Sequence, residues 1–226
     1  MGKFVWFMLA LTVVLNTIVH GVQLSTDYNN NAFQRDINIQ PRHLEIRAEV
    51  KNLITLNAKQ TKLRAKLNKL NMSQYRILIS TFSKAHPFDL QYTMTAIAWH
   101  ESTFGRNPIN LSDPSFGVFH NLITSVVSRT GTKDTAWNRS RVAERLLLDF
   151  DFSFSQSLAE LKYWDNYWKS KKVPKTWSKM VMSYNAGHKY QNGEAYLKAI
   201  KDKIKALRSY TQDHNNIFKA ILRRSY

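Results

Sequence analysis

The chain has 226 residues, 43 % of them hydrophobic, which is enough for one substantial core, and its 7 Gly and 5 Pro exclude collagen-like and low-complexity proteins. The absence of cysteine excludes disulfide scaffolds, Cys-ligated metal centres and thiol catalysis. The 33 Lys and Arg residues against 16 Asp and Glu give a net charge of +17, which favours an anionic partner such as nucleic acid, acidic lipid or an anionic polymer.

Residues 1–21 are predicted to be an export signal. Lys3 precedes an apolar run from Phe4 to Val19, and cleavage would follow Gly21. The apolar run, residues 4–19, is slightly short for a membrane span, so an uncleaved anchor is the alternative. Either outcome places the rest of the chain outside the cytoplasm, in a periplasm or cell-wall space. Export therefore argues against nucleic acid as the anionic partner.

Residues 22–41 are polar and without periodicity, which predicts a linker. Residues 42–71 are predicted to form a basic amphipathic helix, because one face repeats at steps of three and four. That face consists of Leu53, Leu56, Gln60, Leu63, Leu67 and Leu70. Such a helix either docks on its own domain or binds a partner or a membrane surface.

Helical segments follow closely after residue 71, and no run alternates with period two for long. We therefore predict an all-α fold, with one helical domain at residues 72–210 and a C-terminal helix or tail at 211–226. The helices are expected at 72–84, 90–103, 123–128, 141–148, 158–169, 177–185, 194–210 and 216–223. The segment from Phe104 to Phe119 contains Gly and Pro and is predicted to be a loop with at most a small β-hairpin.

Glu101 is the candidate catalytic acid. It completes an apolar stripe at steps of four, three and four that also contains Leu90, Met94 and Ile97. A carboxylic acid buried among apolar groups stays protonated to higher pH, as the proton donor to a glycosidic oxygen must. The spacing alone equally permits a Glu that reaches water or pairs with a basic residue. A zinc site is excluded, because Phe104 stands where the zinc-protease pattern needs its second His.

Three sequence blocks occur in a defined order. They are AIAWHESTFGRNPINLSDPSFGVFH at residues 96–120, MVMSYNAGHKY at 180–190 and GEAYLKAI at 193–200. Together they resemble the active-site segments of lytic transglycosylases with a soluble-type, goose-lysozyme-like catalytic domain. In that family a helix ends in Glu-Ser, a loop leads to Gly-x-x-Gln, and motifs similar to Ala-Tyr-Asn-Ala-Gly and Glu-Thr-x-x-Tyr-Val follow. The resemblance covers roughly residues 75–207 and implies a lysozyme-like fold.

The resemblance also implies a reaction, with Glu101 as its single acid and base. Glu101 would protonate the β-1,4 oxygen between N-acetylmuramic acid and N-acetylglucosamine. It would then take a proton from the C6 hydroxyl that attacks C1, which yields a 1,6-anhydro product. Peptidoglycan is the implied partner, no metal or cofactor is needed, and the basic charge would add attraction to an anionic wall polymer or a membrane surface.

Further residues receive roles from the same resemblance. Tyr184 is expected to orient the Glu101 carboxyl by a hydrogen bond, Asn185 to shape the same wall, and Tyr196 to line the cleft or pack behind it. The implied substrate-binding set is Ser112, Ser115, Gly117, His120, Tyr184, Asn185 and Tyr196.

Two departures from the family pattern leave alternatives open. His120 replaces the glutamine, and its distance in sequence from Glu101 is longer than usual. His120 could make substrate contact pH-dependent or simply pack. If Asp113 faced Glu101 across a water, the protein would be an inverting hydrolytic muramidase or endolysin, although an Asp-Pro pair also starts turns. An inactive glycan-binding scaffold of the same fold is the other alternative.

Overall fold

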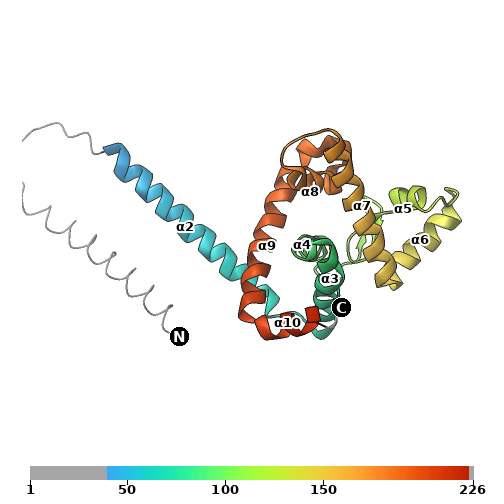
Figure 1. Ribbon diagram of the computed structural model, residues 1–226, viewed down its shortest axis with the longest axis horizontal. Helices are drawn as coiled ribbons and strands as arrows, with labels where there is room; N and C mark the ends of the chain where they lie inside the picture. The colour runs from blue at the N-terminus through green and yellow to red at the C-terminus, as the bar shows by residue number, and fades with distance from the viewer. Residues whose placement is uncertain (1–39, 224–226) are drawn as a thin grey trace, which may run out of the picture. The chain divides into compact units, whose positions relative to one another are not determined.

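The computed structural model describes residues 40–223 (Figure 1). The predicted export signal at 1–21, the candidate anchor at 4–19 and all but the last two residues of the predicted linker at 22–41 lie outside these residues. Within residues 40–223, none of the helices combines the length and the apolar character that crossing a membrane requires. The chain divides into two compact units at residues 50 and 51.

The described residues are mostly helical, which confirms the predicted fold class at the level of an all-α or mostly-α protein. The helices that follow α2 all belong to the second unit. In chain order the helices are α2 (Gln40–Leu67), α3 (Met72–Ala85), η1 (His86–Phe88), α4 (Gln91–Ser102), α5 (Ile123–Arg129), α6 (Ala136–Leu148), α7 (Phe150–Ser170), α8 (Thr176–Ala186), η2 (Gly187–Gly193), α9 (Glu194–Asp213) and α10 (Asn215–Arg223).

Side-chain caps set several of the helix starts. Asn71 accepts a hydrogen bond from the Gln74 backbone N–H at 2.9 Å, which begins α3 and completes a capping box. The side chains of Thr135 and Asp149 accept hydrogen bonds from the backbone N–H groups of Asn138 and Phe152, which begins α6 and α7. These two caps place α6 and α7 five and eight residues ahead of the predicted starts at 141 and 158, so both predicted boundaries were wrong.

The segment after α4 forms a small antiparallel sheet of three two-residue strands in the order β1-β2-β3. These are β1 (Ile109–Asn110), β2 (Ser115–Phe116) and β3 (Asn121–Leu122). Ile109 pairs with Phe116, and Ser115 pairs with Leu122. The sheet thus exceeds the predicted hairpin by one strand, which lies beyond the predicted loop.

The core is built around α4, whose residues from Thr93 to Trp99 are all buried. Figure 1 shows α4 next to α3 and between α9 and α7, and it packs directly on α3 and α9. A helix that is apolar on every side has to be surrounded by other elements. Glu101 lies in the last turn of α4, where its side chain is only partly buried.

Both ends of the second unit depart from the predicted domain scheme. In α2, Leu53 and Leu56 are exposed and Leu67 is fully buried, so the predicted apolar face docks only at its C-terminal end. Lys59 pairs with Asp202 of α9 at the same end. The helix α9 runs through the predicted boundary at residue 210. Buried Phe218 of α10 belongs to the main core, so residues 211–223 are an integral part of the fold.

Candidate functional site

The side chain of Glu101 leaves the last turn of α4 at the edge of a groove and is 16 % exposed. The chain turns sharply after the helix, because Thr103 and Phe104 both have left-handed backbones, with φ of +53° and +56°, and Gly105 follows at +79°. The buried ring of Phe104 anchors this turn in the core. The turn therefore fixes where α4 ends, and with it the position of the carboxyl group.

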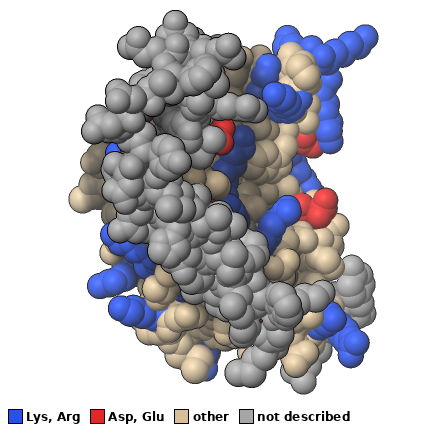
Figure 2. Space-filling model, turned by 90° about the vertical axis from the view of Figure 1, so that its left-hand side faces the viewer, with Lys and Arg blue, Asp and Glu red and all other residues tan. Residues whose placement is uncertain are grey.

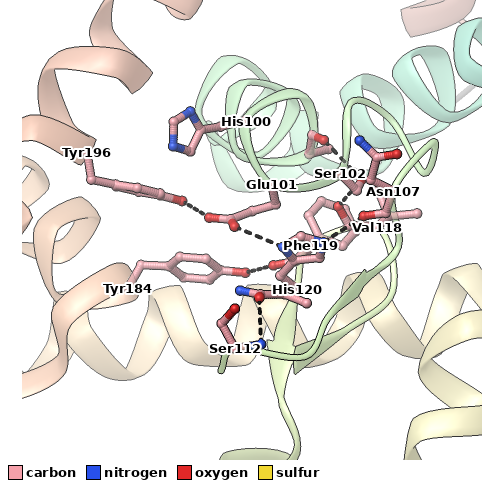
Figure 3. A network of polar contacts seen from close by, with 12 residues as sticks. His100, Glu101, Ser102, Asn107, Ser112, Val118, Phe119, His120, Tyr184 and Tyr196 are labelled. Carbon is pink, nitrogen blue, oxygen red and sulfur yellow. Dashed lines mark hydrogen bonds and ion pairs between the residues drawn. The ribbon is translucent and has the colours of Figure 1, made fainter. Parts of the chain in front are cut away.

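Tyr196 of α9 holds the first oxygen of that carboxyl group. Its hydroxyl donates a hydrogen bond to Oε1 of Glu101 over 2.6 Å (Figure 3). Burial raises the pKa of Tyr196 well above its usual value, and the nearby Glu101 raises it further, so the phenol remains a donor. The rings of His100 and Tyr196 are nearly perpendicular, with 4.9 Å between their centroids.

Tyr184 was expected to make this contact, and that expectation was wrong. Its hydroxyl donates to the carbonyl oxygen of Phe119 over 2.9 Å and also lies 2.6 Å from Oγ of Ser157. A phenol has one proton to donate, and the Phe119 carbonyl takes it. Tyr184 thus supports the loop that carries His120, while Tyr196, expected to line the cleft or pack behind it, orients the acid.

His120 holds the second oxygen of Glu101. Its Nδ1 lies 3.3 Å from Oε2, and its Nε2 lies 2.8 Å from the carbonyl oxygen of Asn107 (Figure 3). Burial by itself lowers the pKa of His120, but the hydrogen bonds to Glu101 and Asn107 and the charge of Glu101 outweigh it, and the net shift is upward. The sequence left a choice between substrate contact and simple packing; the structure adds a direct pairing with the candidate acid.

Ser102 is a site residue that the sequence analysis passed over. Its fully buried hydroxyl donates to the carbonyl oxygen of Val118 over 2.6 Å and accepts from the Gly105 backbone N–H over 2.7 Å. This pair of bonds ties the end of α4 to the loop before His120. The available signal was the Ser that directly follows Glu101 in the Glu-Ser pair.

Gly117 lies in the same loop and packs closely against α6 and α7. Its φ is +84°, and a Cβ atom there would lie 2.4 Å from the carbonyl oxygen of Leu146 and 2.6 Å from Oγ of Ser153. Only glycine permits both the backbone conformation and this close approach. The structure therefore gives Gly117 a packing role in place of the expected substrate contact.

The groove has a volume of about 220 Å³ and collects most of the predicted site. Its walls include five of the eight predicted residues, namely Glu101, Ser115, His120, Tyr184 and Asn185. Ser112 is exposed on the adjoining loop, where its backbone N–H donates to the side chain of Asn110. Tyr196 is not among the lining residues and reaches Glu101 through its hydrogen bond to Oε1.

Two further carboxylates line the groove. Asp113, considered in the sequence as a second carboxylate, lies exposed on the loop between β1 and β2. Glu160 of α7, which the sequence analysis did not single out, pairs with Arg129 of α5 and accepts a hydrogen bond from Nε1 of Trp164 over 2.7 Å. These two partners fix the orientation of the Glu160 side chain, because both donate to its carboxylate.

A basic cluster lies behind the acid. Nζ of Lys203 lies 3.0 Å from Nδ1 of His100. Burial lowers the pKa of His100, and the charge of Lys203 lowers it further, so the ring stays neutral near pH 7. On the face drawn in Figure 2, Lys and Arg clearly outnumber Asp and Glu among the atoms that are not grey.

Comparisons of the chain with protein-family models, with curated proteins and with solved structures found no match. What the molecule itself presents is a mostly helical fold with a groove, and a partly buried, doubly held carboxylic acid at its edge.

Proposed function

We propose that this chain is an exported lytic transglycosylase that cleaves peptidoglycan at the β-1,4 bond between N-acetylmuramic acid and N-acetylglucosamine. The observation that carries the proposal is Glu101, which leaves a buried helix at the groove with each carboxyl oxygen held by a separate partner. The three sequence blocks support it, because they place that acid in the setting of the family they resemble. A lysozyme-like fold for residues 72–210 is part of the same proposal.

In the proposed reaction, protonated Glu101 gives its proton to the glycosidic oxygen while the bond from that oxygen to C1 breaks. The C6 hydroxyl oxygen of the same muramoyl residue then bonds to C1 and returns its proton to Glu101. The product is a 1,6-anhydro sugar, and the carboxyl group is restored. One carboxyl group serves both steps, in contrast to the two-carboxylate glycosidases.

The charge fits such a substrate. Peptide carboxylates of peptidoglycan, anionic wall polymers and phospholipid headgroups are all negative partners outside the cytoplasm, and a basic protein is attracted to them over several ångströms of solution. Specificity would come from the groove, whose walls carry hydroxyl, amide and aromatic groups that suit a sugar.

Product analysis after incubation with purified peptidoglycan tests the proposal, with Glu101→Gln as the matched variant. Glutamine keeps the shape of the side chain but cannot donate a carboxyl proton. We expect anhydro-ended fragments by mass spectrometry with the native protein and none with the variant. Equal cleavage by both proteins would rule out Glu101 as the acid, and wall binding without cleavage by either would favour the inactive scaffold.

A hydrolytic muramidase is the second candidate, and it is favoured by Asp113 and Glu160 in the walls of the same groove. A carboxylate that activates water would give fragments with ordinary reducing ends. If such ends appear, Asp113→Asn and Glu160→Gln identify the base, because only its own variant would lose hydrolysis. Glu160→Gln needs a folding control, since the side chain also pairs with Arg129.

A further inference from the structure

The tautomer of His120 follows from its surroundings. Nε2 of His120 lies 2.8 Å from a backbone carbonyl oxygen, that of Asn107. A carbonyl oxygen only accepts hydrogen bonds, so Nε2 must carry a proton. In the neutral ring, Nδ1 is then an acceptor with its lone pair directed at Glu101.

The location of a proton on Glu101 follows in the same way. Oε1 accepts the hydrogen bond from Tyr196, so a carboxyl proton belongs on Oε2, which faces Nδ1 of His120 at 3.3 Å. With no proton between them, two lone pairs would face each other. With one proton, either Oε2 donates to Nδ1 or the imidazolium donates to the carboxylate.

We propose that His120 is a positioning residue that shares a single proton with Glu101, between Nδ1 and Oε2, so that two groups hold the catalytic proton at the site in place of one. The role in catalysis rests on the proposed function, whereas the shared proton itself does not.

The other titratable groups around Glu101 and His120 do not take part in holding this proton. Tyr196 from α9 and Tyr184 from α8 are phenols whose pKa values burial raises. His100 beside Glu101 is held neutral by burial and by Lys203 of α9. The remaining charges in the groove are Asp113 on the loop and the Glu160–Arg129 ion pair of α7 and α5. Glu160 and Arg129 are paired with each other and not with Glu101 or His120.

The proton count of the pair is unchanged by one turnover. The pair gives one proton to the leaving oxygen as the bond to C1 breaks, and it receives one from the C6 hydroxyl as that oxygen bonds to C1. Coupled groups of this kind lose their last proton at a macroscopic pKa that belongs to the pair. His120 has an upward pKa shift because its bonds to Glu101 and Asn107 and the Glu101 charge outweigh burial, which agrees with retention of the last proton.

The first test compares the pH dependence of kcat/KM for the native protein and for His120→Gln. Glutamine is the residue at this place in the family that the sequence blocks resemble, and it keeps an amide donor near Oε2, so the variant should remain active at low pH. We expect its alkaline limb to fall at a pH lower by about one unit or more, since Glu101 would then hold the proton alone. Identical alkaline limbs in two folded proteins would overturn the proposal.

The second test does not depend on activity. Nitrogen-15 NMR of labelled histidines, with His120 assigned from its loss in His120→Gln, reports both the tautomer and the titration midpoint. We expect the Nε2-protonated tautomer and a midpoint above the ordinary value, which should fall in Glu101→Gln. A midpoint that is the same in both proteins would overturn the shared proton. If the NMR expectation holds but peptidoglycan is not cut, the shared proton stands and the proposed reaction fails.

Discussion

At the scale of single residues, the two oxygens of Glu101 have chemically different partners. Oε1 is bound by the Tyr196 phenol, which always donates, and Oε2 faces the His120 imidazole, which can donate or accept. The contact with Tyr196 therefore orients the carboxyl group, and the contact with His120 holds its proton. They also explain why a polar side chain is stable in the last turn of an otherwise buried helix.

Tyr196→Phe should lower kcat on peptidoglycan about tenfold to a hundredfold, because the carboxyl group loses the bond that sets its direction. Tyr184→Phe is the matched control, since it removes the same hydroxyl from the neighbouring helix α8. It should cost mainly stability, because its partners are Phe119 and Ser157. A larger loss of kcat in folded Tyr184→Phe than in Tyr196→Phe would contradict this division of roles.

The raised pKa of His120 also predicts a pH-dependent stability. Burial lowers this pKa, but the bonds to Glu101 and to the Asn107 carbonyl and the Glu101 charge raise it more, so the folded state favours the charged ring. The stabilisation is fully present below the ordinary value of 6.5 and is lost as the pH rises through the raised value. The free energy of unfolding in urea should therefore exceed that of His120→Gln by a larger amount at about pH 5.5 than at about pH 9. A difference that stays constant across this range would contradict the linkage.

At the scale of elements, the loop that carries His120 is fixed by Gly117. Gly117→Ala should destabilise the protein by about 2 kcal/mol or more, because the new Cβ would collide with the Leu146 carbonyl in a left-handed backbone. Gly131→Ala is the control, since Gly131 has a φ of +65° and open space around its Cβ position. It should cost only the backbone strain, about 1–2 kcal/mol. Equal unfolding free energies for the two variants would show that the close approach does not matter.

The sequence predicted well those helices whose apolar spacing and flanking turn residues mark the same ends. The predictions for 72–84 and 90–103 agree with α3 and α4 to within about a residue at each end, because the apolar spacing and the turn residues coincide there. The starts of α6 and α7 were missed, because Thr135 and Asp149 cap these two helices well ahead of the predicted starts. Strands of two residues have no periodicity to detect, so β3 was not predictable.

The site was predictable in its members but less so in its contacts. Glu101, Ser115, His120, Tyr184 and Asn185 do line one groove. Which tyrosine reaches the acid depends on how α8 and α9 are rotated, and packing around buried residues such as Ile200 decides that. The partner of Nε2 in His120 is a backbone carbonyl, which no side-chain motif records.

At the scale of the whole molecule, the net charge of +17 predicts a salt-sensitive encounter with the substrate. At 0.1 M salt, the attraction between exposed charges more than about 10 Å apart is largely screened. The cleavage rate on intact walls should therefore fall steeply with added salt. The rate on short, uncharged glycan fragments should change little, because it depends on the groove alone. Parallel salt dependence on both substrates would assign the effect to the chemistry.

The loop between α4 and α5 is fixed at both ends, and this affects how the substrate specificity of such a protein can change. Its entry is set by left-handed residues 103–105 and by the Ser102 hydroxyl, and its exit by Gly117 and the bonds at 118–120. The exposed stretch from Leu111 to Pro114, between β1 and β2, can therefore be exchanged while both ends of the loop stay fixed. Substitutions there can remodel one rim of the groove for a different glycan while the acid and its tyrosine keep their places, so new specificity can arise without rebuilding the chemistry.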